Sequence, residues 1–391
     1  MLRRGVPSGD RLSASLNVQR MRYSLGVNLA FLFGSGLAAV FLFSQSVSLP
    51  IFLSHADGVS SSVTPRVVAT FEPATWLSSE NIRPATPRSG GIDCTRDVWH
   101  YLEACGWAGP ANTGYPAGIA LTATNGRTIT TDNAVIDGER IKGALRIAAK
   151  NVIIKNSWIV SDFSDLGTGT ALNGTGVVTI EPGASATVSH CTLDGSNATH
   201  AGIWHTGTRL TAIGNNIFGV NDGIFSWPDR ANEKSGWNVT IEDNYLHDFT
   251  TLAANGHIDG YQTEGASHGV IRHNTFYIKQ DQNAAISIWN SRRDSDDFLI
   301  DNNLAAGAGF LMYAEDYDPS EKHPQGGYSV TNIFHTNNRF STALYPCAGR
   351  YGVWYPRGAP SDGWHRSGNK ILETGESVDL SNPHVKGQLC R

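Results

Sequence analysis

The sequence predicts an all-β solenoid, in which the chain winds through successive coils of parallel strands. A short phrase returns seven times between residues 151 and 340: two or three β-forming residues, a polar pair that often contains Asn, and an apolar residue. The copies, such as 239–246 and 269–276, lie 25 to 36 residues apart, which is enough for one irregular coil. Polar residues and Gly interrupt each apolar run within about 4–8 residues, so the repeat is β rather than helical.

The N-terminal part divides into three segments before the solenoid. Residues 1–22 contain five Arg and one Asp, and residues 23–56 contain no Asp, Glu, Lys or Arg. This pattern predicts a basic cytoplasmic end followed by a signal anchor or a cleaved signal peptide, and both alternatives stay open. Residues 57–93 are rich in Ser, Thr and Pro and are expected to be a linker. Residues 94–391 are then the β-helix domain, outside the cell or at its surface, either secreted or anchored by one transmembrane helix.

Five cysteines in an exported chain indicate disulfides at the ends of the solenoid. Cys94 and Cys105 flank residues 95–104, which we expect to form a short amphipathic helix that caps the first coil. Cys347 and Cys390 are expected to fasten the last segment. Cys191 occupies the polar position of its repeat and is predicted to be a buried free thiol.

The repeat also predicts a polar ladder and the register of a second row of strands. Stacked Asn side chains can hydrogen-bond from coil to coil, and the phrase assigns this role to Asn216, Asn244, Asn274, Asn302 and Asn338. A second alignment matches the strand starts at Gly202, Gly223, Gly260, Ala285 and Gly309. It places Asp222 and Asp259 one above the other on adjacent coils.

Over about residues 94–391, the chain resembles the right-handed parallel β-helix proteins of the pectate-lyase-like superfamily. The resemblance rests on the repeat length, the Asn-x-apolar phrase and the Asp-Gly-apolar strand starts. The segment 221–224 is similar to the Asn-Thr-Asp-Gly motif of polygalacturonase-type hydrolases, but the other motifs of that group and of the pectate lyases are absent in matching register. The resemblance implies an architecture and no subfamily.

The stacked carboxylates are the main catalytic candidates. Mutual repulsion should raise the pKa of one of them unless a cation lies between them. In a hydrolase, Asp222 and Asp259 would act as acid and base. In a lyase, they would bind Ca²⁺, which is the only cofactor expected, and His257 or Arg272 would transfer the proton. The alternative for each Asp is a bend cap that binds backbone N–H groups.

An aromatic row is predicted to follow the acids along the same strands. Strand alternation puts Trp204 and Gln262 on one face, with Trp227, Glu264, Trp289 and Tyr313 two residues further on. Glu264 adds a further candidate catalytic carboxylate. We expect this face to be exposed and to bind the apolar faces of sugar rings, whereas packing beneath long loops is the alternative.

Composition narrows the class of function. A net charge of -5 without a basic stripe argues against nucleic acid as a partner. The sequence favours an exported or anchored monomeric enzyme that cleaves an acidic or cell-envelope polysaccharide, as a glycoside hydrolase or a polysaccharide lyase. The alternative is a non-catalytic cell-surface solenoid that binds glycan or has a structural role.

Overall fold

The computed structural model describes residues 91–161, 175–229, 236–252, 256–315, 328–387 and 390–391. The expected cytoplasmic end, the apolar segment and nearly all of the linker lie outside this part. Within the described residues, no helix is long and apolar enough to cross a membrane. The described residues belong to one compact unit.

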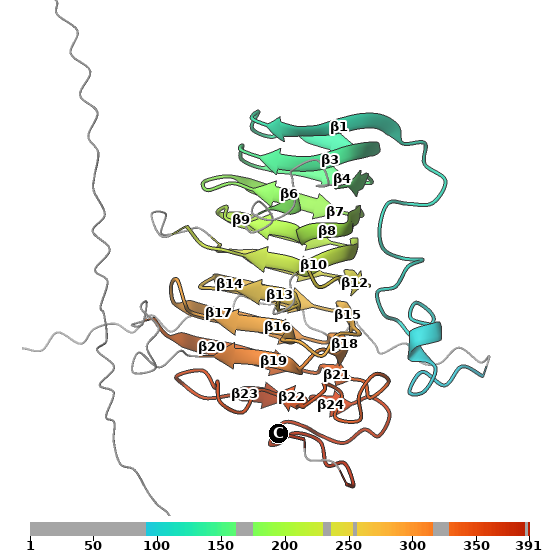
Figure 1. Cartoon of the computed structure of the whole chain (residues 1–391), viewed down its shortest axis with the longest axis vertical. Helices are drawn as coiled ribbons and strands as arrows, with labels where there is room; N and C mark the ends of the chain where they lie inside the picture. The colour runs from blue at the N-terminus through green and yellow to red at the C-terminus, as the bar shows by residue number, and fades with distance from the viewer. Residues whose placement is uncertain (1–90, 162–174, 230–235, 253–255, 316–327, 388–389) are drawn as a thin grey trace, which may run out of the picture. The chain divides into compact units, whose positions relative to one another are not determined.

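The chain forms coils of parallel strands stacked along one axis (Figure 1). A fifteen-stranded sheet contains β1 (Thr122–Ile129), β3 (Glu139–Ile147), β5 (Trp158–Val160), β6 (Gly176–Ile180), β8 (Thr192–His205), β10 (Asn216–Ser226), β12 (Tyr245–His247), β13 (Asp259–Thr263), β15 (Thr275–Ile278), β16 (Ala284–Trp289), β18 (Leu304–Gly307), β19 (Phe310–Glu315), β21 (Arg339–Phe340), β22 (Gly352–Trp354) and β24 (Lys370–Ile371). A nine-stranded sheet contains β2 (Val135–Asp137), β4 (Val152–Lys155), β7 (Ser185–Ser189), β9 (Arg209–Ile213), β11 (Val239–Glu242), β14 (Ser267–Arg272), β17 (Ser295–Asp301), β20 (Val330–Thr336) and β23 (His365–Ser367).

The larger sheet bends and so supplies two walls of the solenoid. The first wall contains β5, β12, β15, β18, β21 and β24, and the second wall contains β6, β13, β16, β19 and β22. Strands β8 and β10 are long enough to take part in both walls. The nine-stranded sheet is the third wall. The predicted solenoid of parallel coils is therefore confirmed.

One side-chain row from each wall fills the interior. On the second wall the inward row runs through Ile203, Ile224, Tyr261, Ile286 and Met312, which are paired from coil to coil and have no exposed surface. Each coil thus buries apolar area against the coil above and below it, which is the main stabilising contribution in a solenoid.

A buried Asn ladder lies at the bend between the third wall and the first wall. Each ladder amide donates to the side-chain oxygen of the next, at 2.8–3.0 Å. Its members are Asn215, Asn244, Asn274, Asn303, Asn338 and Asn369. The prediction of a ladder is confirmed, but Asn216 and Asn302 were the wrong members of two Asn-Asn pairs. Asn369 was not predicted, and its amide donates to Asp379.

Glycine sharpens the bend between the first and second walls. A Cβ on Gly202, Gly223 or Gly260 would lie 2.4 Å from a core side chain, so these residues face inward. The next residue of each strand also faces the core. Two successive inward residues interrupt the alternation, so that Asp222 on one side of the bend and Phe225 on the other both face outward.

The segment before β1 does not cap the first coil, which corrects the prediction of an amphipathic capping helix. Its helical part is a single 3₁₀ turn, Val98–His100. The indole of Trp99 donates to Ser341 at 2.8 Å, and the Gly106 carbonyl lies 2.7 Å from His273 Nε2. We call residues 91–121 the strap, because they cross the outside of the first wall from its late coils to β1 (Figure 1).

The expected disulfides are both present. Cys94–Cys105 closes the loop of the strap, and Cys347–Cys390 joins the last segment to the late coils. Cys191 is buried and free, as predicted, and burial raises the pKa of its thiol to about 12. A thiol with this pKa stays protonated and unreactive at neutral pH.

Candidate active site

Two carboxylates lie on the outer side of the glycine bend. Asp222 on β10 pairs with Ala201, and Asp259 on β13 pairs with Ala284. The backbone N–H of Asp259 donates to Asp222 Oδ1 at 3.0 Å. Neither Asp has any exposed surface. The predicted carboxylate stack is therefore present, but it is buried.

Three side chains fix the orientation of Asp259. Ser287 donates to Oδ1 at 2.6 Å, Asn283 donates to Oδ2 at 2.7 Å, and His257 Nδ1 lies 3.2 Å from Oδ2. An ionised carboxylate accepts hydrogen bonds but donates none, so each of these neighbours acts as the hydrogen-bond donor to Asp259.

Asp222 has fewer side-chain partners than Asp259. Asn221 donates to Oδ1 at 3.1 Å, and His200 Nε2 lies 3.2 Å from Oδ2. Burial raises the pKa of Asp222, and the nearby charge of Asp259 raises it further, while the contact with His200 opposes this change. The expected rise of one pKa in the stack thus has burial as its main cause rather than repulsion.

His257 is the group through which this pair reaches solvent. Its side chain is 44% exposed, whereas both carboxylates beneath it are at 0%. The hydrogen bond to Asp259 raises the pKa of His257 to about 9. Because Nδ1 faces buried Asp259, the exposed part of the ring carries Nε2. A carboxylate that holds an imidazole in this way fixes the ring for proton transfer at the other nitrogen.

The same cluster is a candidate site for a metal ion. Asp222, His257 and Asp259 each offer one ligand atom, and these atoms lie within 4.8 Å of one another. Calcium prefers six to eight oxygen ligands, whereas this set includes a ring nitrogen, and three of its carboxylate oxygens, both of Asp259 and Oδ1 of Asp222, already accept hydrogen bonds from protein groups. The residues therefore fit calcium poorly, and the proposed reaction does not depend on a metal.

Glu264 and Gln262 lie further along β13 and the turn after it. The Gln262 amide donates to Glu264 Oε1 at 2.8 Å, and the Ser291 hydroxyl donates to the other oxygen. Burial raises the pKa of Glu264, which also interacts electrostatically with Asp259 and His257. Gln262 and Glu264 are 1% and 5% exposed. They are therefore buried neighbours of the Asp259–His257 pair rather than groups that a substrate can reach.

The aromatic residues form two groups rather than one exposed row. Trp204 and Phe225 are 7% and 3% exposed and pack edge to face, with ring centroids 4.7 Å apart. Half-buried Trp227 adjoins them, and the Arg292 guanidinium lies 4.3 Å from its ring centroid. The prediction that this face is exposed is therefore wrong for Trp204, which has a packing role, and also for Gln262 and Glu264, which are buried.

The second aromatic group adjoins His257. The His257 and Trp289 ring centroids lie 6.1 Å apart, Trp289 contacts Tyr313, and Tyr313 stacks on Tyr355 at 4.3 Å. Tyr313 pairs with Ser287, so it lies two residues away from its predicted place beside Trp289. Both Trp289 and Tyr313 are half-buried. They extend from the imidazole towards the late coils.

Arg272 lies elsewhere. It is on β14 of the third wall, where its guanidinium is 3.4 Å from Asp301 and 3.9 Å from Glu242. The structure does not bring Arg272 to the carboxylate pair. Conversely, His200, Asn283 and Ser287 contact the two carboxylates, and these contacts were not predicted from the sequence. His200 could have been found, because it precedes Ala201, which the register already placed beside Asp222.

Comparison with known proteins gives no further assignment. No protein family, curated protein or solved structure matches this chain.

Proposed function

We propose that this protein cleaves an acidic polysaccharide and that His257, held by Asp259, carries the proton. The observation on which this depends is a half-exposed imidazole bonded to a fully buried carboxylate. The proposal includes a right-handed parallel β-helix of the pectate-lyase-like superfamily, working outside the cell or at its surface. Two disulfides support an oxidising compartment.

Elimination suits this geometry better than hydrolysis. Hydrolysis uses two carboxyl groups at the substrate, about 5–9.5 Å apart, whereas Asp222 and Asp259 are inaccessible and have oxygens within 4.8 Å of each other. Elimination needs one accessible base. Neutral His257 would take the proton from C5 of a uronate, the electron pair would form the C4–C5 double bond, and the O4 leaving group would accept a proton from water.

The test is a screen of the full chain on uronate-containing and neutral glycans. Growth of absorbance near about 235 nm would report the unsaturated uronate product of a lyase, and new reducing ends without that band would identify a hydrolase instead. We expect the band to grow. His257→Gln should lower turnover by at least about 10²-fold.

His268→Gln is the matched control. His268 also contacts an Asp through Nδ1, at 2.8 Å, and its side chain is 50% exposed, but it lies on the third wall. Turnover should be unchanged in this variant. Equal losses in both variants would contradict the role of His257.

Chelation tests the calcium alternative. We expect turnover to be indifferent to EDTA, because protein donors occupy both oxygens of Asp259 and Oδ1 of Asp222. Loss of turnover with EDTA and recovery with Ca²⁺ would instead place calcium at Asp222 and Asp259.

The second candidate is a glycan-binding protein without catalysis. It is favoured by the inaccessibility of both carboxylates. Binding without any product across the whole panel would establish it.

A further inference from the structure

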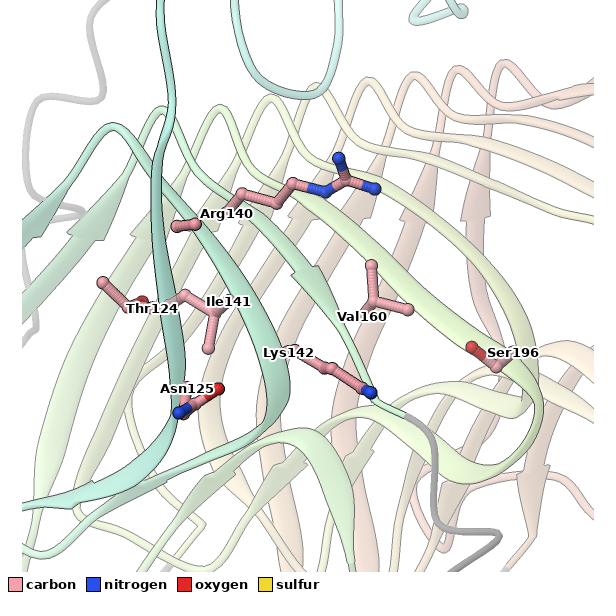
Figure 2. Close-up of a pocket in the computed structure, with 8 residues that line it drawn as sticks. Thr124, Asn125, Arg140, Ile141, Lys142, Val160 and Ser196 are labelled. Carbon is pink, nitrogen blue, oxygen red and sulfur yellow. The ribbon is translucent and has the colours of Figure 1, made fainter.

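A cavity of about 570 Å³ lies on the outer face of the first wall, near the start of the solenoid (Figure 2). Its lining residues belong to β1, β3, β5 and β8, and β10 lies between β8 and β13 in the sheet. Its lining residues are Ala123, Thr124, Asn125, Arg140, Ile141, Lys142, Val160 and Ser196. The volume is in the range of sites that bind small molecules.

Two cations of β3 face this cavity. Ile141 between them is fully buried in the core, so strand alternation turns Arg140 and Lys142 outward. Figure 2 shows both side chains extending towards Val160 and Ser196. Among the described residues, neither cation has a carboxylate partner within 4.0 Å. Their neighbours differ, since Arg127 pairs with Glu139 at 2.8 Å and Arg146 with Glu181 at 2.5 Å.

Aromatic packing holds Arg140 in place. Its guanidinium lies 4.7 Å from the ring centroid of Trp158, and Trp158 stacks on Tyr115 of the strap with an interplanar angle of 10°. Stacking orients a guanidinium, and the N–H groups in the plane of the guanidinium remain available to a ligand. A planar guanidinium held in this way is suited to a carboxylate.

Among the residues that the structure describes, the two nearest acids are already engaged by other groups. Glu139 is engaged by Arg127 and by the Thr124 hydroxyl, at 2.7 Å. Asp194 accepts the backbone N–H of Ser196 at 2.8 Å. The lining itself contains two positive and no negative side chains.

We propose that this cavity is a second glycan-binding site, which takes an acidic sugar unit. Arg140 and Lys142 bind the anionic group, Asn125 and Ser196 face the hydroxyls, and Val160 contacts the apolar side of the ring. The site would hold a polysaccharide chain away from the place of cleavage. The preference of the cavity for an anion follows from Arg140 and Lys142 and does not depend on the proposed function. Its preference for a sugar rests on the proposed function.

Calorimetry with octagalacturonate tests the site on the full chain, in the His257→Gln background so that no substrate is consumed. Arg140→Gln with Lys142→Gln should weaken binding by at least about tenfold, as expected for loss of two charge-assisted contacts. The control pair is Arg146→Gln with Lys150→Gln, which removes the same charge outside the cavity and should change affinity by less than about twofold.

A second variant leaves Arg140 and its packing on Trp158 unchanged. Asn125→Asp places a negative charge in the cavity and should also weaken octagalacturonate binding, with the thermal midpoint unchanged. Equal affinities in the cavity and control pairs would overturn the proposal. Binding of inorganic phosphate as tight as that of octagalacturonate would overturn the sugar assignment and leave a simple anion site.

The result separates this site from the active site. If the cavity pair weakens binding while the wild-type chain yields no product on the glycan panel, the second site stands and the proposed cleavage fails. Cleavage of short uronate oligomers should be unchanged in Arg140→Gln with Lys142→Gln, because the cavity lies outside the β10–β13 site. A fall in that turnover would overturn the assignment of a separate site.

Discussion

The solenoid has two buried stacks of polar side chains, one at each of two bends. In the Asn ladder, every amide has both a donor and an acceptor, so each member satisfies the next. In the carboxylate stack, ionised Asp222 and Asp259 can only accept hydrogen bonds. They therefore depend on donors from outside the stack, such as His257, Asn283 and Ser287. A stack of amides can repeat without limit, whereas a stack of acids needs outside donors and therefore forms only locally.

This difference separates structure from chemistry. The ladder amides are neutral and bond one another, so they change little with pH. The acids hold a titratable imidazole at the surface and raise its pKa. Polar burial by itself is not a sign of function. Burial that needs a titratable partner from outside the stack is a better sign.

The largest expected effect is on the ladder. Asn274→Ala removes the acceptor of Asn244 and the donor to the Ile241 carbonyl. Buried groups left without partners should lower the free energy of unfolding by about 3–5 kcal/mol, measured by denaturant titration. Asn302→Gly is the control, because Asn302 has a φ of 51° and lies outside the ladder; its cost should be below about 1 kcal/mol. Equal costs would contradict the assigned register.

The second effect distinguishes the two acids. Asp259→Asn weakens the support of His257 and should lower turnover by at least about 10²-fold. The pKa of His257, followed by NMR, should fall from about 9 towards its ordinary value of 6.5, because Asp259 is the main cause of the rise. Asp222→Asn should cost only about tenfold, since Asp222 reaches His257 more weakly. The reverse order would make Asp222 the supporting acid.

The third effect is a pH dependence. If neutral His257 is the base, kcat/KM should rise with pH and level off above about 9, the pKa of His257. Stability should change in the opposite direction. The folded pKa exceeds the unfolded one, so the stabilisation by the Asp259–His257 pair is complete below about 6.5 and is lost as pH rises through about 9. Unfolding titrations of wild type and His257→Gln should converge above that pH, and parallel curves would contradict it.

The smallest effect concerns the strap. Cys94→Ser opens a loop with a sequence separation of 11 and should lower the local opening free energy of the strap by about 2 kcal/mol. Hydrogen exchange should increase in the strap, with β6 and the ladder unchanged, because coils depend mainly on their neighbours. Faster exchange throughout the solenoid would show that the strap stabilises the whole stack.

The repeat made most of the fold predictable, because strands, disulfides and the acid stack follow from local patterns. The errors have physical causes. At Asn215–Asn216 and Asn302–Asn303 both residues are Asn, and a shift of one residue exchanges the inward and outward faces. For Tyr313 the strand start at Gly309 was misaligned by two residues, because Ala284 pairs with Phe310 and Leu311 rather than Gly309 therefore lies beside Ala285.

The acids and His257 of the site were predictable from the sequence, whereas most of the side chains around them were not. The burial of Trp204 depends on packing against Phe225 of the next coil and against His200 of its own strand. Asn283 reaches Asp259 from a loop that carries no repeat signal. The strap was misplaced for the same reason, since nothing in residues 94–105 encodes contact with Ser341 or His273.

The path of the strap has a consequence for how the molecule is made. Residues synthesised early, around Trp99, have their docking surface on residues synthesised late, around Tyr277 and Ser341. The early coils can stack as they emerge, but the strap must wait until the chain is nearly finished. Docking of the strap would thus be among the last folding events, and a truncated product that lacks the late coils would leave its apolar residues uncovered for recognition by chaperones or proteases.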